Sequence, residues 1–346
     1  MRIEDEIKLD FKDVLFKPKR SKLESRRDVD LLRTFKFHNS GNEWTGVPIV
    51  ASNMDGVGTF TMAKKLQEHK MLTIMRKHYT LDEWNQAIGD GVKMKYLSVC
   101  TGTAAIWDPE AADFATMNAV LEAYPDIKFI TVDVANAYHE NFGDFISRLR
   151  DRYPNKTIIA GNVITAEMVE ELIIKGADII KCGIGPGSVC TTRLMTGVGI
   201  PQLSGIIECA DAANGIGGHI IADGGCVYPG DVSKAFGAGA HFTMLGGMLA
   251  GHDESEGEIL DGMVKFYGMS SDEAMSIYGS RKSGYRGAEG KVVTVPHKGS
   301  VDNTVTEILG GVRSTCTYIG ANRIKDMPKC AVFVRCLNTH NTVYGG

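Results

Sequence analysis

Short runs of apolar residues recur along the central part of the chain, and stretches with a helical pattern separate them. Apolar residues fill these runs continuously instead of alternating with polar ones, as is typical of parallel strands that helices cover on both faces. Eight strands are predicted, at residues 48–53, 72–75, 97–101, 129–134, 157–163, 178–184, 219–225 and 241–247.

The segments between these runs carry apolar residues at helical spacing. One helix is expected after Thr59, a suitable N-cap residue. The clearest pattern begins at Thr165 and ends before Gly176, which suits the C′ position. Its apolar face consists of Met168, Val169, Leu172 and Ile173. Eight strand–helix units in succession predict an α/β fold, a single-domain (β/α)8 TIM barrel. A doubly wound sheet is the alternative, because periodicity does not count strands reliably.

We expect residues 1–346 to form one domain. Residues 1–47 are interpreted as an irregular N-terminal segment, and residues 48–251 hold the eight units. Residues 252–300 form a flap region whose glycine-rich part, up to Gly290, has the composition of a mobile loop or of a solvated surface loop. Residues 301–346 are expected to contain a closing helix, from Asp302 toward Arg313, and a tail that starts at Arg335.

Composition and charge exclude several classes of function. Apolar residues make up 43% of the chain, and the net charge is −4 without a long basic run, which argues against nucleic acid or a membrane as partner. The charged first residues do not predict a signal peptide, and no apolar stretch is long enough to span a bilayer. The eight cysteines include no Cys-x-x-Cys pair. We therefore expect a reduced, cytoplasmic protein without a zinc site or disulfides.

Polar residues and glycines gather where the predicted strands end, which is where a barrel places its function. Taken singly, each is better explained as a turn residue, but their joint placement indicates a site. Glycines after the last two strands suit a phosphate group. The residues are Asn53, Asp55, Lys77, His78, Asp133, Asn136, Asn162, Asp223, Gly224, Gly225, Gly246 and Gly247. His219 and His241 begin strands and are interpreted as structural.

The loop after the sixth strand, residues 183–193, is the strongest candidate for chemistry. Its glycines expose backbone amides and carbonyls, and Ser188 offers a hydroxyl to a phosphate oxygen. Cys190 is a candidate nucleophile, although a tight turn with an incidental buried cysteine would look the same. No Gly-x-Gly-x-x-Gly opens a helix and no P-loop is present, so a dinucleotide would not be held as in a Rossmann fold.

This loop, together with residues 176–181, closely resembles the IMP dehydrogenase/GMP reductase family. The resemblance runs from residues 11–15 to residues 310–318 and includes the blocks at 53–55, 77–79, 133–136, 197–199, 223–225 and 244–251. Two features favour the reductase branch. Only residues 79–96 separate Lys77-His78 from the third strand, which leaves no room for the regulatory CBS insert of the dehydrogenases. The flap carries Tyr285-Arg286, the reverse of the dehydrogenases' water-activating Arg-Tyr pair.

The resemblance implies an NADPH-dependent oxidoreductase of purine salvage that converts GMP to IMP and releases ammonia. In that reaction the Cys190 thiolate attacks purine carbon 2, ammonia leaves to give a thioimidate, and NADPH delivers hydride to the same carbon. Thr192 and Glu289 are the implied proton relay.

The remaining contacts are also implied by the resemblance. Substrate contacts map to Ser188, Asp223, Gly224, Gly225, Gly246, Gly247, Gly268, Met269, Ser270, Arg286 and Gly290. Cofactor contacts map to Lys77, Asp133, Val134, Ala135, Ile184, Gly185, Ser270, Tyr285 and Arg286. Ser25, Arg26, Ser314 and Thr317 would reach the cofactor of a neighbouring subunit, which implies a homotetramer. Backbone carbonyls of Gly185, Gly187, Cys190 and Arg193 resemble a potassium site.

The chain departs from the family pattern at Ala137, where glycine is usual, at Cys182, where valine is usual, and at Arg281 and Lys282 of the flap. Two alternatives to the reductase remain. One is an IMP dehydrogenase that lacks the regulatory insert and uses NAD⁺ and water. The other is a catalytically idle barrel that senses purine nucleotides, against which the set of Cys190, Thr192 and Glu289 argues.

Overall fold

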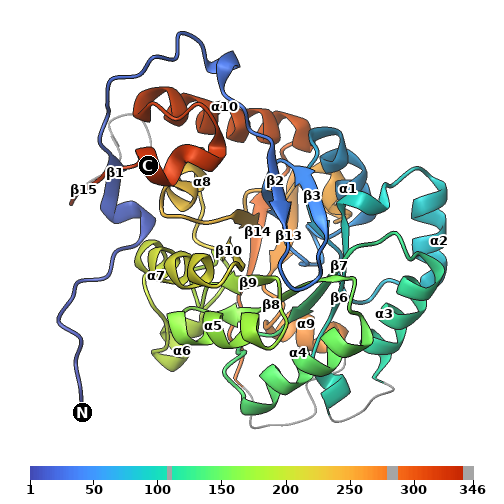
Figure 1. The fold of residues 1–346 in the computed structure, drawn as a ribbon. Coiled ribbons are helices and arrows are strands. Elements are labelled where there is room, and N and C mark those ends of the chain that lie inside the picture. The colour runs from blue at the N-terminus through green and yellow to red at the C-terminus, as the bar shows by residue number, and fades with distance from the viewer. Residues whose placement is uncertain (107–110, 279–286, 338–346) are drawn as a thin grey trace.

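Eight parallel strands close into a barrel in which each strand pairs with its neighbours in chain order and the last pairs with the first (Figure 1). The computed structural model describes residues 1–106, 111–278 and 287–337. The strands are β4 (Ile49–Ala51), β5 (Leu72–Ile74), β6 (Leu97–Thr101), β7 (Phe129–Asp133), β8 (Thr157–Val163), β9 (Ile179–Cys182), β10 (His219–Asp223) and β11 (Phe242–Leu245). The predicted TIM barrel is confirmed, and the doubly wound alternative is wrong because the sheet closes.

Helices follow the barrel strands and cover the outside of the sheet. They are α1 (Phe60–Leu66), α2 (Leu81–Gly89), α3 (Ala112–Ala123), α4 (Glu140–Arg152), α5 (Ala166–Ile174), α6 (Thr192–Thr196), α7 (Gln202–Gly215) and α8 (Pro229–Gly237). Thr59 caps α1 as expected, because its Oγ1 accepts the Met62 amide at 3.1 Å. Thr165 occupies the N-cap position of α5 without a side-chain capping bond, and Gly176 follows the helix with φ of 111°.

The two ends of the chain contain more regular structure than the sequence indicated. Within the expected irregular segment, β1 (Val14–Phe16) pairs with β15 (Phe333–Arg335), and β2 (Arg33–Lys36) forms a hairpin with β3 (Glu43–Gly46). Arg335 therefore belongs to a strand and not to a tail. The closing helix α10 (Val301–Ile319) starts before Asp302, because Ser300 caps it, and it continues past Arg313 because Cys316 and Ile319 extend its buried face.

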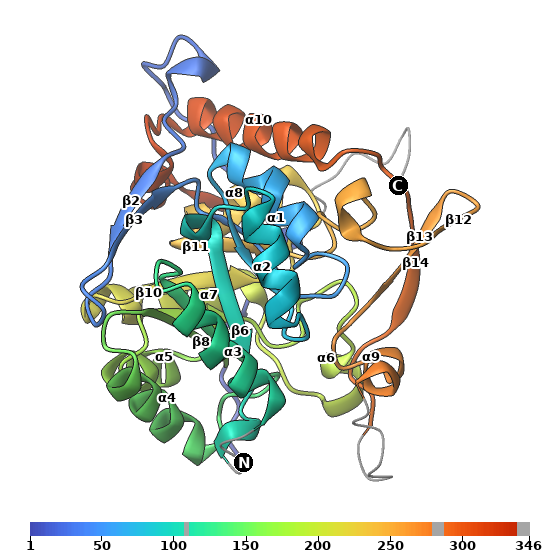
Figure 2. The same ribbon diagram turned by 90° about the vertical axis from the view of Figure 1, so that its right-hand side faces the viewer.

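The region predicted as a flap contains an antiparallel sheet of β12 (Ile259–Leu260), β13 (Met263–Tyr267) and β14 (Val292–Pro296), and the helix α9 (Asp272–Ile277). The part of the flap with Arg281, Lys282, Tyr285 and Arg286 lies outside the described residues. Figure 2 shows this sheet, with α6 and α9, on the right of the barrel and the hairpin β2–β3 on the left. The two structures thus cover opposite sides of the barrel.

Aromatic rings close the end of the barrel at which the strands begin. Phe35 of the hairpin stacks on Phe242, with ring centroids 4.2 Å apart, and Trp44 packs edge-on against Phe129. His241 is buried there, where its Nδ1 accepts the Ile220 amide. This position supports the structural interpretation of the histidines that begin strands.

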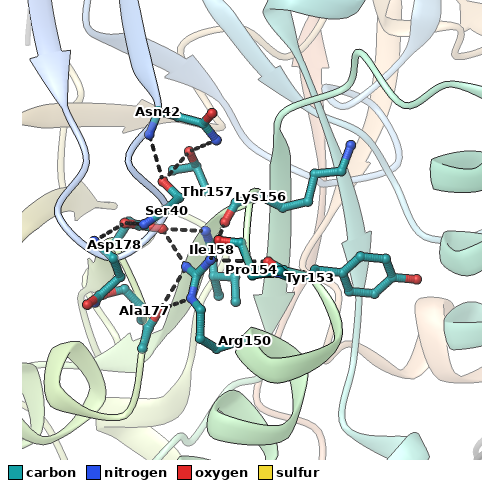
Figure 3. Close-up of polar contacts among 12 residues, drawn as sticks. Ser40, Asn42, Arg150, Tyr153, Pro154, Lys156, Thr157, Ile158, Ala177 and Asp178 are labelled. Atoms are coloured by element: carbon teal, nitrogen blue, oxygen red, sulfur yellow. Dashed lines mark hydrogen bonds and ion pairs between the residues drawn. The ribbon is translucent and has the colours of Figure 1, made fainter.

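A buried ion pair fastens the hairpin loop to the barrel (Figure 3). The side chain of Asp178 accepts the amides of Asn39 and Ser40 and the amide of Ile158, each at 3.0 Å. Arg150 of α4 donates to the same carboxylate at 2.7 Å, and its guanidinium also reaches several backbone carbonyls. Because all of these partners are backbone groups or an opposite charge, the carboxylate stays compensated although it is buried.

Candidate active site

The loop between β9 and α6 lies against the end of β10. A Cβ atom at Gly183 would collide with the carbonyl oxygen of Asp223, and one at Gly224 would lie 3.2 Å from the amide nitrogen of Gly187. Gly185 has φ of 78°. Glycines are therefore required at these positions because two backbone segments approach each other closely.

The predicted phosphate-binding residues converge on the same loop. The hydroxyl of Ser188 would lie only 2.7 Å from a Cβ atom at Gly247, so the loop after β11 touches the loop after β9. Gly246 is next to Met54, whose sulfur would be 3.0 Å from a Cβ there. Ser188 is exposed, so its hydroxyl and the amides of the neighbouring glycines are groups that could bind an anion.

Cys190, Thr192 and Glu289 form a continuous chain of contacts. The Cys190 Sγ lies 3.2 Å from the Thr192 Oγ1, and this hydroxyl donates to the Glu289 Oε2 at 2.8 Å. Because the single hydroxyl proton of Thr192 points to Glu289, a neutral Cys190 thiol is left to donate to the hydroxyl oxygen. The geometry thus links the Cys190 sulfur to a carboxylate through one hydroxyl.

Backbone pairing holds Glu289 beside the cysteine loop. The Thr191 amide donates to the Glu289 carbonyl at 2.8 Å, and the Lys291 amide donates to the Val189 carbonyl at 2.9 Å. Cys190 and Gly290 face each other as an antiparallel bridge. The end of the flap therefore forms one wall of the site.

The segment before α9 adjoins this wall and brings the predicted base-contacting residues together. The Glu289 amide donates to the Ser270 carbonyl at 3.1 Å, and the Gly268 amide donates to the Lys291 carbonyl at 3.2 Å. Met269 lies between these two contacts and is half-buried. A Cβ at Gly290 would lie 2.9 Å from the Ser271 amide, so glycine is needed there too. Tyr285 and Arg286, also predicted for this region, lie outside the described residues.

A buried lysine joins the two carboxylates at the mouth of the barrel. The Lys181 ammonium contacts the Asp133 Oδ1 and lies 3.4 Å from the Asp223 Oδ2. Asn53 donates to Asp133 at 2.9 Å, and Asn162 donates to Asp223 at 2.7 Å. The sequence analysis did not select Lys181, because it stands inside a predicted buried strand. A lysine within an otherwise apolar run was the available signal.

Charge pairing determines the protonation of this cluster. Burial alone would raise the pKa of Asp133, but Lys181 and Lys77 lower it from 3.8 to about 2, with help from the hydrogen bond of Asn53. Lys77 also donates to the Asp133 carbonyl oxygen at 3.2 Å. Burial would lower the pKa of Lys181, but Asp133 and Asp223 outweigh it and raise that pKa. Both partners are therefore charged at neutral pH.

A cavity of about 660 Å³ opens next to the Thr192–Glu289 pair. Its volume is in the range of pockets that hold drug-sized molecules or cofactors. Of the residues predicted to contact a cofactor, it is lined by Val134, Ala135 and Ile184. Asn136, which the sequence analysis selected at the end of a strand, also lines it. The sequence analysis assigned no contact to its other walls, which are Thr103, Tyr138, Ile164, Thr165, Thr196, Val198, Gly199 and Ile200.

Lys77, Asp133, Gly185 and Ser270 do not line this cavity, and neither do the four residues predicted to contact the cofactor of a neighbouring subunit. Ser25 and Arg26 lie at the short helix η2 (Arg26–Asp28), which packs against α10, the helix that carries Ser314 and Thr317. Figure 2 shows α10 at the top of the molecule and α6 near the bottom. The two pairs of residues therefore lie on elements that contact each other, and none of the four residues lines the cavity beside Thr192.

The carbonyl groups predicted to bind potassium differ in their hydrogen bonds. The Gly187 carbonyl accepts the Cys190 amide at 3.1 Å, and the Arg193 carbonyl accepts the Gly197 amide at 3.2 Å. No hydrogen bond from a described residue reaches the carbonyls of Gly185 and Cys190. Hard oxygen atoms of this kind suit an alkali cation. Side chains do not add to the set: the described residues include no group of three or more His, Cys, Asp or Glu placed to hold a metal ion.

The two departures from the family pattern that the structure describes lie in the interior. Ala137 and Cys182 are both fully buried. The Cys182 thiol donates to the Ile180 carbonyl at 3.6 Å, and burial together with the neighbouring Cys209 raises its pKa. Cys182 is therefore a protonated core residue, in contrast to the partly accessible Cys190.

Among the described residues, no helix is long and apolar enough to cross a membrane.

Comparisons with known proteins agree with this geometry. The family model described as "IMP dehydrogenase / GMP reductase domain" matches residues 8–342. The chain is 54% identical over 351 residues to the GMP reductase of Vibrio cholerae serotype O1, covering all of this chain and 99% of that protein. It is 53% identical to GMP reductase 1 of Mus musculus and to GMP reductase 1 of Homo sapiens, with 99% of each chain covered in both comparisons.

Proposed function

The chain belongs to the IMP dehydrogenase / GMP reductase family, and on this premise we propose that it is a GMP reductase, which converts GMP to IMP with oxidation of NADPH and release of ammonia. The contact chain from Cys190 through Thr192 to Glu289 is the observation that carries the proposal, because the reaction needs a nucleophile and a proton donor at one carbon. The short connection between β5 and β6, which holds only α2 and η4 (Met94–Tyr96), also favours it over a dehydrogenase with a regulatory insert.

Proton transfer along this chain explains how Cys190 becomes reactive. The thiol proton moves to the Thr192 oxygen as the hydroxyl proton of Thr192 moves to Glu289. This shift creates the thiolate and a protonated Glu289 in one event. The thiolate then forms a bond to purine carbon 2.

The same relay runs backwards when the amine leaves. Glu289 returns its proton through Thr192 to the departing nitrogen, the bond between carbon 2 and that nitrogen breaks, and the nucleotide remains attached to Cys190 as a thioimidate. NADPH, when bound, supplies the hydride that reduces carbon 2. As that carbon–hydrogen bond forms, the carbon–sulfur bond breaks and Cys190 is released. Two easier steps thus replace one difficult displacement.

We assign the cofactor to the cavity beside Thr192, whose volume of about 660 Å³ is large enough for such a molecule. Val134, Ala135 and Ile184 would hold it there, next to Thr192 and Glu289 of the relay, and the cofactor would supply the hydride. We assign the contacts of Ser25, Arg26, Ser314 and Thr317 to the cofactor of an adjacent subunit in a homotetramer. None of the four lines the cavity beside Thr192 within one chain, which supports this assignment.

The substrate phosphate would lie against Ser188 and the glycines after β10 and β11, and Asp223 would accept hydrogen bonds from the ribose. Carbonyls of Gly185, Gly187, Cys190 and Arg193 would hold a potassium ion, whose charge orders the loop around the nucleophile. The protein is proposed to act in purine salvage in the cytoplasm.

Product analysis of the purified protein tests the proposal. With GMP and NADPH we expect IMP and ammonia in equal amounts, and with IMP and NAD⁺ we expect no xanthosine monophosphate. Production of xanthosine monophosphate would make the protein a dehydrogenase without the insert. Binding of GMP without turnover under either condition would instead favour the nucleotide sensor.

A further inference from the structure

A second cavity, of about 600 Å³, lies at the end of the barrel where the strands begin. Phe129 and Thr157, the first residues of β7 and β8, line it. Asp133 and Asn162, at or near the far ends of the same strands, belong to the candidate active site. The length of the barrel thus separates this cavity from Cys190, and its occupant is neither the substrate nor the cofactor of the proposed reaction.

The walls of this cavity are mainly apolar. They come from the hairpin β2–β3, the end of α2, the segment up to η4 and the start of β7. Two polar residues of the lining satisfy each other, because the Asn42 amide donates to the Thr157 hydroxyl at 3.2 Å (Figure 3). An apolar molecular body would be removed from water here at little polar cost. The apolar lining residues are Phe37, Trp44, Ile88, Val92, Met94 and Phe129.

The rim of the cavity carries positive charge. Lys93, Lys95 and Lys128 are exposed lining residues, and none of them forms an ion pair with a described residue. The acidic lining residues are Glu43 and Asp126. Glu43 is turned to a lysine outside the cavity, since its carboxylate lies 3.8 Å from the Lys36 ammonium.

The positive charge of Lys128 acts on the nearby side chain of Lys156. The Lys156 ammonium donates to the carbonyls of Pro125 and Ile127, directly before Lys128. Burial lowers the pKa of Lys156, and the positive charge of Lys128 lowers it further, against the opposing effect of Asp126. Lys128 and Asp126 thus act on this ammonium in opposite directions, and the effect of the lysine is the larger.

We propose that this cavity is a binding site for a small organic anion, composed of an apolar body and one phosphate, sulfonate or carboxylate group. The body would lie on the aromatic and aliphatic walls, and the acidic group would lie between Lys93 and Lys128 at the rim. Lysines bind such groups as point charges, without the planar geometry that arginine requires. The two parts of the lining together select an amphipathic anion over an inorganic ion and over a neutral hydrocarbon.

A matched set of probes tests this site in the full-length protein. The probes are 8-anilinonaphthalene-1-sulfonate, the uncharged N-phenyl-1-naphthylamine, which lacks only the sulfonate, and inorganic phosphate, which lacks the apolar body. Titration of fluorescence or heat gives the affinity for each. We expect the sulfonate to bind more tightly than the other two probes and to bind more weakly as salt is raised.

Three variants locate the binding. In the double variant Lys93→Gln and Lys128→Gln the affinity for the sulfonate should fall about tenfold, because two attractive charges are lost. The affinity for the uncharged probe should stay the same. The pair Lys325→Gln and Lys329→Gln, two exposed lysines outside the cavity, should leave both affinities unchanged. Met94→Glu, which puts a negative charge on the wall, should abolish sulfonate binding.

Crystals soaked with the sulfonate should show it between Lys93 and Trp44. The proposal is wrong if the two lysine pairs change the affinity for the sulfonate equally, or if the uncharged probe binds as tightly as the sulfonate. It is also wrong if Met94→Glu has no effect on sulfonate binding. The tests need no turnover, so they stand apart from the proposed reductase activity.

Discussion

The hydroxyl of Thr192 donates a hydrogen bond of 2.8 Å to the carboxylate of Glu289, although the two residues are 97 positions apart in the chain. The first residue of α6 is thereby tied to the segment that leads into β14. Because Cys190 contacts the same hydroxyl, opening or closing of the flap would make or break the path for its proton. The proposed chemistry depends on this pairing.

Removing either member of the relay should slow the reaction without preventing substrate binding. Glu289→Gln keeps the size of the side chain but cannot take up a proton, and Thr192→Val removes the hydroxyl. We expect kcat to fall by about 10²–10⁴, the contribution of general acid–base catalysis, with little change in KM for GMP. Steady-state kinetics checks this expectation.

Glu258→Gln serves as the control for the relay, because this carboxylate is exposed in the same region and makes no contact with Cys190. Its kcat should equal that of the wild type. A Glu289→Gln protein with the wild-type rate would remove Glu289 from the mechanism.

Replacing Cys190, the proposed nucleophile, should separate binding of GMP from its conversion. Cys190→Ala removes only the sulfur, and the surrounding loop is held by backbone contacts that the change leaves in place. We expect GMP to bind with an affinity within about threefold of wild type, while turnover falls below detection. Calorimetric binding together with an activity assay distinguishes this result from unfolding. Undiminished turnover would exclude Cys190 as the nucleophile.

The Lys181 ammonium should contribute strongly to stability. Lys181→Met leaves the Asp133 and Asp223 carboxylates close together without their cation, and we expect a loss of about 3 kcal/mol in the free energy of unfolding. Lys265→Met breaks an exposed pair with Glu273 and should cost less than about 1 kcal/mol. Urea denaturation of both variants provides the comparison, and equal losses would contradict the account.

The ion pair of Lys181 and Asp133 also leads to a prediction about stability at low pH. The pKa of Asp133 is lowered from 3.8 to about 2 in the folded protein, so its contribution to stability is present above about pH 4 and is lost as the pH falls toward 2. In Lys181→Met the lowering of the pKa by the ammonium is absent. The variant should therefore lose less stability than wild type across this window.

Two histidines at the starts of barrel strands, His219 and His241, lead to a prediction about stability in a second pH range. Burial lowers the pKa of His219 from 6.5 to about 4 and places that of His241 well below its usual value. Both are neutral in the fold, so stability is complete above about pH 6.5 and falls as the pH decreases toward 4, by at most about 1.4 kcal/mol per pH unit for each residue. His219→Phe, which should pack against Phe35 and Phe37, removes one of these terms. Denaturation at several pH values in this range gives the free energy of unfolding as a function of pH. This dependence should be less steep for the variant, and an unchanged dependence would refute the assignment.

Local patterns were sufficient to predict the barrel and to single out the loop around Cys190, whereas Thr192 and Glu289 were predicted from the family resemblance. The strands are continuous apolar runs because both of their faces are covered, and the loop around Cys190 stands out because its close approach to Asp223 requires glycines. The flap wall was harder to place, since Glu289 reaches the site through backbone pairing with Thr191, which leaves no trace in the side-chain pattern.

Long-range pairing and compensated charge were not visible in the sequence. The strands β1 and β15 have three residues each and pair across almost the whole chain. Neither strand is long enough to show a periodic pattern of apolar residues. Lys181 lies in an otherwise apolar strand and did not stand out as a site residue. Its burial is possible because Asp133 and Asp223, which come from other strands, compensate its charge. In both cases the information lies in the partner and not in the segment itself.

The most direct test of the proposed reaction follows the transferred hydrogen. The protein is supplied with GMP and with NADPH that carries deuterium at the transferable position, and the purine product is analysed by mass spectrometry and NMR. We predict IMP with deuterium at carbon 2, formed in equal amount with ammonia, and no product with Cys190→Ala. IMP without deuterium at carbon 2, or consumption of NADPH without release of ammonia, would contradict the account.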